Sequence, residues 1–308
     1  MTNATATQRA TPQEAARLMR LATYASVSVA AVLIVAKLVA WQLSGSVSLL
    51  ATLVDSSLDA LASLVNLFAV RHALSPADEE HRFGHGKAEA LAGLGQAALI
   101  TGSSMFLMYE GIQRIIDPVE LEAFQVGMWV MVFSIVMTVL LLTFQRHVIL
   151  RTNSTAIRAD ALHYRTDLLV NASVLLALGL SHWGWPGFDA LFALMIAFYI
   201  LYSAWEIITH AFDHLMDREL PDEEREVIAH TVLAHAEVRG LHDLRTRRSG
   251  TATFMQMHIE LDDDLSLLEA HRIADEVESA IVEVYPGAEV IIHPDPLSVV
   301  GVEARQEF

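Results

Sequence analysis

Residues 126–144 read VGMWVMVFSIVMTVLLLTF, a stretch that contains no charged side chain. A helix needs about 20 mostly apolar residues to cross the hydrocarbon core of a bilayer, and this stretch is long enough to do so. Five further segments have similar lengths, although three of them are interrupted by polar residues that need partners inside a helix bundle. The predicted spans are 20–43, 46–72, 88–116, 124–146, 158–182 and 187–212. The sequence therefore predicts an α-helical membrane domain of six helices over residues 20–213.

The composition is typical of a chain with one membrane part and one water-soluble part. Hydrophobic residues make up 53% of the 308 residues and charged residues 19%, against about a quarter in ordinary soluble proteins. The net charge of −17 comes largely from the C-terminal part and argues against a nucleic-acid partner. The chain has no cysteine, which excludes disulfides, thiolate metal sites and cysteine nucleophiles. A bound transition metal must therefore be held by His, Asp and Glu.

The basic residues predict the orientation of the spans. Three connections, SGS, IDPVELEA and SHWGWPG, contain no Lys or Arg. The N-terminal segment and the other two connections are basic, and cytoplasmic loops are the ones that carry this excess. The N-terminal segment 1–19 is polar and lacks the layout of a signal peptide, so the first span is expected to direct insertion. Both termini are therefore predicted to be cytoplasmic. The basic residues concerned are Arg9, Arg17 and Arg20, then Arg71, Arg82 and Lys87, then Arg146, Arg151 and Arg158.

The C-terminal residues 214–308 follow the patterns of a small soluble domain. An amphipathic helix with an acidic first turn is predicted from Pro221 onward. Two alternating segments joined at Ser249-Gly250 predict a β-hairpin. A second helix over 266–285 and a short strand over 288–296 follow. The order αββαβ predicts a ferredoxin-like α+β cytoplasmic domain.

Two pairs of ionisable residues lie inside the predicted spans. Asp55 and Asp59 are four residues apart in the second span, as are His163 and Asp167 in the fifth, so each pair shares one helix face. A single buried Asp is as often a structural polar contact, but two matched pairs favour a functional site because charge is costly in a membrane. If the two faces meet, three carboxylates and one imidazole form a four-coordinate site of the kind that Zn²⁺ accepts. Asp160, near the cytoplasmic end of its helix, is expected to be solvated.

The loop PADEEHRFGHGKAE holds a second group of metal-ligand residues. Asp78, His81 and His85 converge if the loop turns at Gly84 and Gly86. Loops with this content are more often solvated than metal-bound, and the residues by themselves favour the solvated interpretation.

A third group lies in the soluble domain. Strand-borne histidines can gather into a binuclear site in which a carboxylate bridges two ions, although surface histidine is an equally good interpretation. The candidate ligands are His242, His258, His293 and Asp295 on or beside the strands, and His271 on the second helix. The other histidines show no comparable grouping and are assigned structural roles: His72, His147, His182, His210, His214, His230 and His235.

Several ordered motifs between Gly45 and Pro296 resemble one transporter family. The chain is similar to the cation diffusion facilitators, and most of all to their bacterial YiiP-type branch of zinc and iron efflux pumps. The motifs that carry the resemblance are SVSLLATLVDSSLDALASL, FGHGKAEALA, RADALHYRTD, LPDEER, HDLRTRRSG and VIIHPDP.

The resemblance implies a homodimer that exports a divalent metal in exchange for protons by alternating access. It assigns Asp55, Asp59, His163 and Asp167 to a transport site, and it makes Asp78, His81 and His85 a metal site in the cytoplasmic loop. His242, His258, His293 and Asp295, supported by His271, would form a binuclear site in the C-terminal domain. Lys87 and Asp217 match a charge pair between the two domains that helps to hold such dimers together. The short connection RHVILRTNST, where many eukaryotic relatives carry a His-rich loop, indicates a bacterial inner (plasma) membrane exporter.

One imidazole with three carboxylates suits Zn²⁺ or Cd²⁺, and Fe²⁺, Co²⁺ and Mn²⁺ stay open. Two alternatives come from other functional classes. A membrane-bound metal sensor would not need Asp55 and His163 inside the bilayer. A hydrolytic metalloenzyme would need an open, water-facing site with a general base, and no such motif is evident. The sequence therefore predicts a secondary active transporter of Zn²⁺ before any other metal, and not an enzyme.

Overall fold

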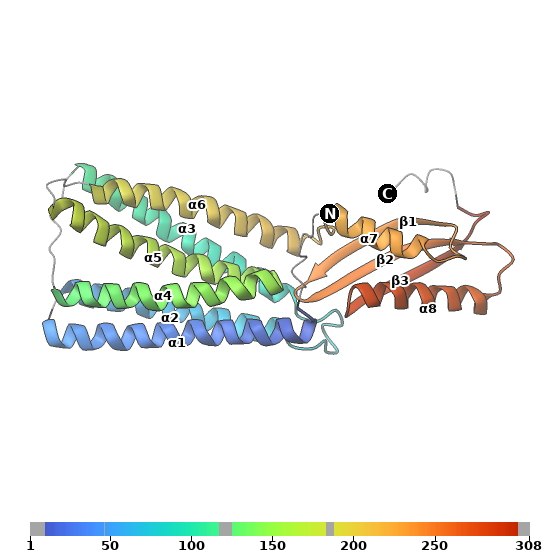
Figure 1. Cartoon of the computed structure of the whole chain (residues 1–308), viewed down its shortest axis with the longest axis horizontal. Helices are drawn as coiled ribbons and strands as arrows, with labels where there is room; N and C mark the ends of the chain where they lie inside the picture. The colour runs from blue at the N-terminus through green and yellow to red at the C-terminus, as the bar shows by residue number, and fades with distance from the viewer. Residues whose placement is uncertain (1–9, 46, 117–124, 183–187, 301–308) are drawn as a thin grey trace, which may run out of the picture.

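The computed structural model describes residues 10–45, 47–116, 125–182 and 188–300. The molecule is elongated, with a bundle of long helices at one end and a small domain of helices and strands at the other (Figure 1). The long helices are α1 (Pro12–Ser44), α2 (Val47–Ala73), α3 (Lys87–Ile116), α4 (Gln125–Thr152), α5 (Thr155–His182) and α6 (Phe188–Leu215). The predicted six-helix domain is confirmed.

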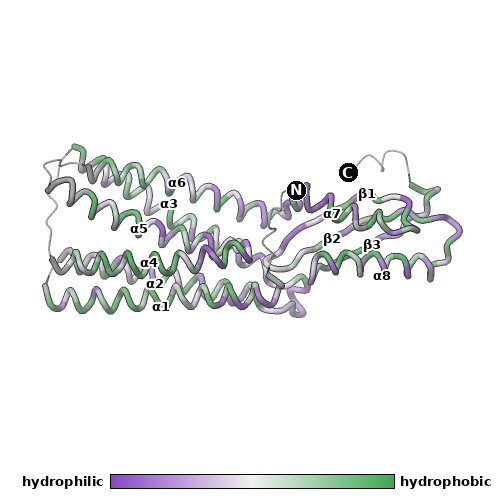
Figure 2. The backbone as a smooth tube through the Cα atoms, in the orientation of Figure 1, coloured by the Kyte–Doolittle hydropathy of each residue, from purple (hydrophilic) through white to green (hydrophobic). Residues whose placement is uncertain are grey.

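Five of the six helices, α1 to α4 and α6, are long and apolar enough by themselves to cross a membrane. Their outward surfaces carry large apolar side chains, including Trp129, Phe198 and Trp205, which a lipid environment would cover. Figure 2 shows apolar residues along most of the helical domain and more polar residues toward the small domain. The helix α5 is more polar, since it contains Arg158 and Asp160 as well as the predicted site residues.

The first helix begins at Pro12, well before the predicted start at residue 20. The reason is a capping box, in which Thr11 Oγ1 accepts from the Glu14 backbone N–H and the Glu14 carboxylate accepts from the Thr11 N–H. Pro12 then occupies the first turn, where its missing N–H costs nothing. The second half of the polar N-terminal segment 1–19 is therefore helical and continuous with the first span.

The helices pack most closely at the end next to the small domain. There, α5 is buried almost continuously from Ala156 to Tyr164 against α3, α4 and α6. Toward the far end of the bundle, α5 and α6 diverge from α4 and α1 (Figure 1). The bundle is therefore closed on the side that the basic loops predict to be cytoplasmic.

The small domain confirms the predicted order of elements. It contains α7 (Asp222–Leu233), β1 (Gly240–Ser249), β2 (Ala252–Leu261), α8 (Leu267–Val284) and β3 (Ala288–Pro296). The sheet has the order β1-β2-β3, with β1 and β2 antiparallel and β2 and β3 parallel. Apolar side chains of both helices, such as Ile228 and Ile273, pack with Met255 and Met257 of the sheet to form one core.

Candidate metal centres

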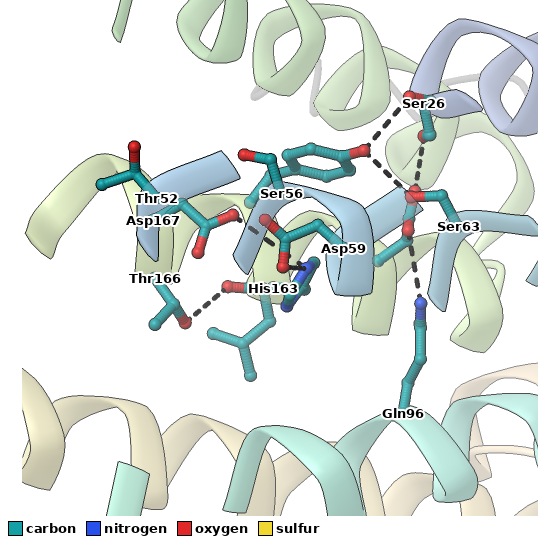
Figure 3. A network of polar contacts seen from close by, with 12 residues as sticks. Ser26, Thr52, Ser56, Asp59, Ser63, Gln96, His163, Thr166 and Asp167 are labelled. Atoms are coloured by element: carbon teal, nitrogen blue, oxygen red, sulfur yellow. Dashed lines mark hydrogen bonds and ion pairs between the residues drawn. The ribbon is translucent and has the colours of Figure 1, made fainter. Parts of the chain in front are cut away.

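Asp59 of α2 meets His163 and Asp167 of α5 inside the helical bundle (Figure 3). His163 Nε2 lies 3.0 Å from Asp59 Oδ1 and 4.0 Å from Asp167 Oδ2. One ligand atom from each residue lies within 4.8 Å of the other two. The exposed fractions of these side chains are between 16% and 29%, so the group is shielded but open to a small ion. Two carboxylates and one imidazole can bind a divalent transition metal here.

Asp55, predicted as the fourth ligand, is not part of this group. Its side chain is exposed on α2, one turn from Asp59 and toward the far end of the bundle. The ligand atoms that lie within 4.8 Å of one another come from Asp59, His163 and Asp167, and Asp55 is not among these residues. Sequence spacing fixes the helix face of Asp55 but not the distance between α2 and α5.

Asp160 is fully buried, so the expectation that it would be solvated was wrong. Its carboxylate accepts from Ser26 Oγ at 2.5 Å, from Gln145 Nε2 at 2.7 Å and from Gln96 Nε2 at 3.3 Å. These donors come from α1, α4 and α3, so one carboxylate joins four helices at the closed end of the bundle. The hydrogen bonds offset the cost of removing this group from water.

Tyr164 extends this network toward the metal ligands. Its hydroxyl donates to the Ser26 carbonyl at 3.1 Å and lies 2.9 Å from Ser63 Oγ (Figure 3). The side chain is buried between α1, α2 and α5. Polar contacts therefore continue from the Asp59–His163 level to Asp160 at the closed end of the bundle.

The predicted loop cluster forms just after α2. Asp78 Oδ1 lies 3.2 Å from His81 Nδ1, and Asp78 Oδ2 lies 3.3 Å from His85 Nε2. The chain turns at Gly84, where φ is +75°, as the sequence predicts. The backbone N–H of His81 is the main cause that lowers the pKa of Asp78 below its ordinary value, so the carboxylate is ionised and available as a ligand at neutral pH.

The C-terminal histidines form one row across the sheet. His242 of β1 is the register partner of His258 of β2, which is the partner of His293 of β3. Asp295 Oδ2 lies 3.4 Å from His242 Nε2 and 2.7 Å from His258 Nδ1, while Asp295 Oδ1 lies 3.2 Å from His293 Nε2. Because both carboxylate oxygens face imidazoles, Asp295 is placed to bridge two ions.

His271 stands apart from that row. It lies on α8 with 70% of its side chain exposed, and its Nε2 is 3.6 Å from Asp275. Within the described part of the chain it is not in a metal-ligand group.

Lys87 and Asp217 connect the helical bundle to the small domain. Lys87 Nζ lies 3.0 Å from the Asp217 carboxylate, and Arg247 of β1 approaches the same carboxylate at 3.3 Å. Partial burial raises the pKa of Asp217, but the hydrogen bonds and charges of Lys87 and Arg247 outweigh it and hold that pKa below its ordinary value. The predicted charge pair therefore exists within one chain.

Two family models cover nearly all of this architecture. The model of the cation efflux transmembrane domain matches residues 23–216, and that of the cytoplasmic domain of cation efflux proteins matches residues 220–297. The chain belongs to the cation efflux family. This result confirms the predicted family, and it identifies the chain as a multi-pass membrane transporter rather than an enzyme.

Bacterial members of the cation efflux family match nearly the whole length of the chain. The cation-efflux pump FieF of Klebsiella pneumoniae is 52% identical over 296 residues, which cover 96% of this chain and 98% of that pump. FieF of Escherichia coli strain K12 / DH10B is 50% identical over 296 residues, with 96% and 99% covered. FieF of Pectobacterium atrosepticum is 53% identical over 290 residues, with 94% and 97% covered.

The cation efflux domain also contains a polar residue that sequence reasoning missed. Lys37 is the only charged residue of the first predicted span apart from Arg20 at its very start. Its Nζ donates to Ser56 Oγ at 2.6 Å and to the Thr52 carbonyl at 3.3 Å, next to Asp55 on α2. A lone Lys in an apolar span was the available signal, since intramembrane charge usually serves function.

Proposed function

We propose that this cation efflux protein exports a divalent transition metal, Zn²⁺ before any other, from a bacterial cytoplasm across the inner membrane in exchange for protons. The cluster of Asp59, His163 and Asp167 carries the proposal, because two carboxylates and one imidazole held together inside a membrane domain are costly and favour a cation-binding role. One imidazole with oxygen ligands favours Zn²⁺ or Cd²⁺ and tolerates Fe²⁺, Co²⁺ and Mn²⁺. The bacterial relatives are named cation-efflux pumps, and this supports transport out of the cytoplasm.

Proton exchange follows from the ligand chemistry. Imidazole and carboxylates must give up protons to bind a metal, so protons and metal compete for the same atoms. We propose that metal binds from the cytoplasm when the closed end opens, and that protons displace it when the site faces outward. In the described arrangement the bundle is closed next to the small domain, and Asp55 lies outside the cluster. Asp55 would join as the fourth ligand when α2 and α5 approach each other, which is an alternating-access step.

A homodimer with both termini in the cytoplasm is the assembly that we propose. The loop and C-terminal metal sites would bind the same ion from the cytoplasm and bias the conformation of the dimer. The pair of Lys87 and Asp217 would hold the two domains in register during that change. His271, exposed on α8, would contribute to the C-terminal site only in the assembled dimer.

The decisive experiment is Zn²⁺ flux in proteoliposomes that contain a pH-sensitive dye. Zinc movement accompanied by proton counter-movement is expected for the wild type, and Asp59→Ala should abolish both signals. Glu278→Ala, which removes an exposed carboxylate of α8, is the matched control and should leave both unchanged. Zinc flux that persists unchanged after the proton gradient is collapsed would refute antiport. A wild-type protein that binds zinc but transports none would favour the alternative function of a membrane-bound metal sensor.

A further inference from the structure

His72, which the sequence analysis assigned a structural role, lies against the loop cluster. It belongs to the last turn of α2, and the loop with Asp78, His81 and His85 follows directly. We propose that His72 is the fourth ligand of the loop site, which would then hold its metal with three imidazoles and one carboxylate. This inference rests on the proposed function of the loop cluster as a metal site.

The imidazole rings are in consecutive contact. The centroid of the His72 ring lies 4.5 Å from that of His85, and the His85 centroid lies 4.6 Å from that of His81. Asp78 contacts both His81 and His85 with its two oxygens. His85 is thus at the centre, with a second histidine on each side and the carboxylate facing it.

One buried nitrogen at the centre of this group has no partner among the described residues, although Asp78 contacts His81 and His85. The His85 side chain is only 7% exposed, and its buried Nδ1 has no hydrogen-bond partner in the described part of the chain. Three imidazoles and one carboxylate gathered at one place are a donor set that suits a divalent transition metal. A bound cation with the carboxylate as counter-charge would explain the arrangement.

The fourth ligand changes the kind of site. Three protein ligands leave an open position that water fills, whereas four close the tetrahedral shell of a structural Zn²⁺ site. His72 is exposed at the end of a helix, so its ring can turn about two side-chain bonds to aim a nitrogen at the metal. The same helix carries Asp59, and closure of the loop site would therefore tie the loop to the end of a transport-site helix.

The absence of cysteine from the chain allows a direct test. In the full-length protein in detergent, Asp59→Ala and Asp295→Ala would first remove the other two proposed sites. His72→Cys then introduces the only thiol, and its binding to Co²⁺ should give the near-ultraviolet thiolate-to-cobalt charge-transfer band. His147→Cys, an exposed histidine at the cytoplasmic end of α4, is the matched control and should give no such band.

Affinity measurements complete the test and separate the two proposals. His72→Phe, which keeps ring packing but removes the ligand, should weaken Zn²⁺ binding by at least about tenfold, the loss typical of disturbing even an outer partner of a metal ligand. His81→Phe should weaken it as well. If His81→Phe loses metal while His72→Phe binds like the parent and His72→Cys gives no band, His72 is not a ligand but the loop site stands. If neither variant loses metal, the loop cluster is not a metal site and both proposals fall.

Discussion

Asp160 and Asp167 lie on the same helix, two turns apart, yet the structure gives them opposite surroundings. The Asp167 carboxylate lies 4.0 Å from His163 Nε2 and is partly exposed. Asp160 is enclosed by side-chain donors from three other helices. The same side chain therefore fixes the bundle at position 160 and, in the proposed function, binds the transported ion at position 167. Local hydrogen-bond donors, and not the residue type, decide which role it takes.

The difference predicts the outcome of two substitutions. Asp160→Ala removes the acceptor of the buried Gln96 amide and one of the two acceptors of the Gln145 amide, which keeps Ser26 Oγ at 3.0 Å. A buried group left without a partner costs about 1–3 kcal/mol. The substitution should lower the midpoint of thermal unfolding in detergent. Asp167→Ala should abolish zinc transport while it leaves that midpoint within about one degree or two, because partly exposed groups can turn to water. Equal stability of Asp160→Ala and the wild type would contradict the structural role of Asp160.

At the scale of elements, a β-bulge places the C-terminal histidines opposite each other. From Ser249 to Arg245 the strand β1 pairs with β2 in one register, in which His242 would face Ile259. The register shifts between His242 and Arg245, and His242 is paired with His258 instead. Asp243 lies within the shift and has a φ of +48°, a conformation that L-residues adopt with difficulty. The bulge thus re-aims an imidazole toward the neighbouring strands.

This geometry makes the metal affinity of the C-terminal domain sensitive to position 243. Asp243→Val should disfavour the left-handed conformation by about 1–2 kcal/mol and weaken Zn²⁺ binding at this site by roughly tenfold. Asp243→Gly permits the conformation and should keep more of the affinity, although it also removes a carboxylate 3.8 Å from His258. Isothermal titration calorimetry of the full-length protein would compare them. Equal affinities of the Val and Gly variants would show that the bulge conformation does not control the site.

At the scale of the whole molecule, the two domains meet through a small set of contacts beside the loop site. Arg247 of β1 lies over the rings of Phe83 in the loop and Phe254 in β2, at 5.1 Å and 4.6 Å from their centroids. Gly86 approaches the hairpin so closely that a Cβ there would lie 2.3 Å from the Ser249 carbonyl oxygen. The loop with the proposed metal site therefore contacts the small domain directly.

The ion pair at this junction predicts a defined pH dependence. The pKa of Asp217 is lowered in the folded protein, so its stabilising contribution is present above its unfolded pKa and is lost as pH falls through the folded pKa. Asp217→Asn should lower stability by about 0.2–1 kcal/mol at neutral pH, as expected for a partly exposed pair. The difference from the wild type should be constant between about pH 6 and 8 and shrink below about pH 4. Thermal unfolding of the metal-free protein checks this, and a difference that grows in acid would contradict it.

The sequence by itself determined the features that depend on near neighbours. Apolar runs of sufficient length specify the six helices, and spacing by four residues puts Asp55 with Asp59 and His163 with Asp167 on single helix faces. The alternation around Ser249-Gly250 specifies the hairpin. These patterns also carry the family resemblance that the family models confirm.

Only the tertiary structure decided which of those faces meet. Ser26 and Asp160 are 134 residues apart in the chain, and nothing local indicates that they form a hydrogen bond. The same is true of the exclusion of Asp55, of the bulge that aligns His242 with His258, and of the approach of His72 to His85. Each depends on distances between elements, which side-chain packing sets to within a few ångströms, while sequence periodicity specifies only directions around a helix or across a strand.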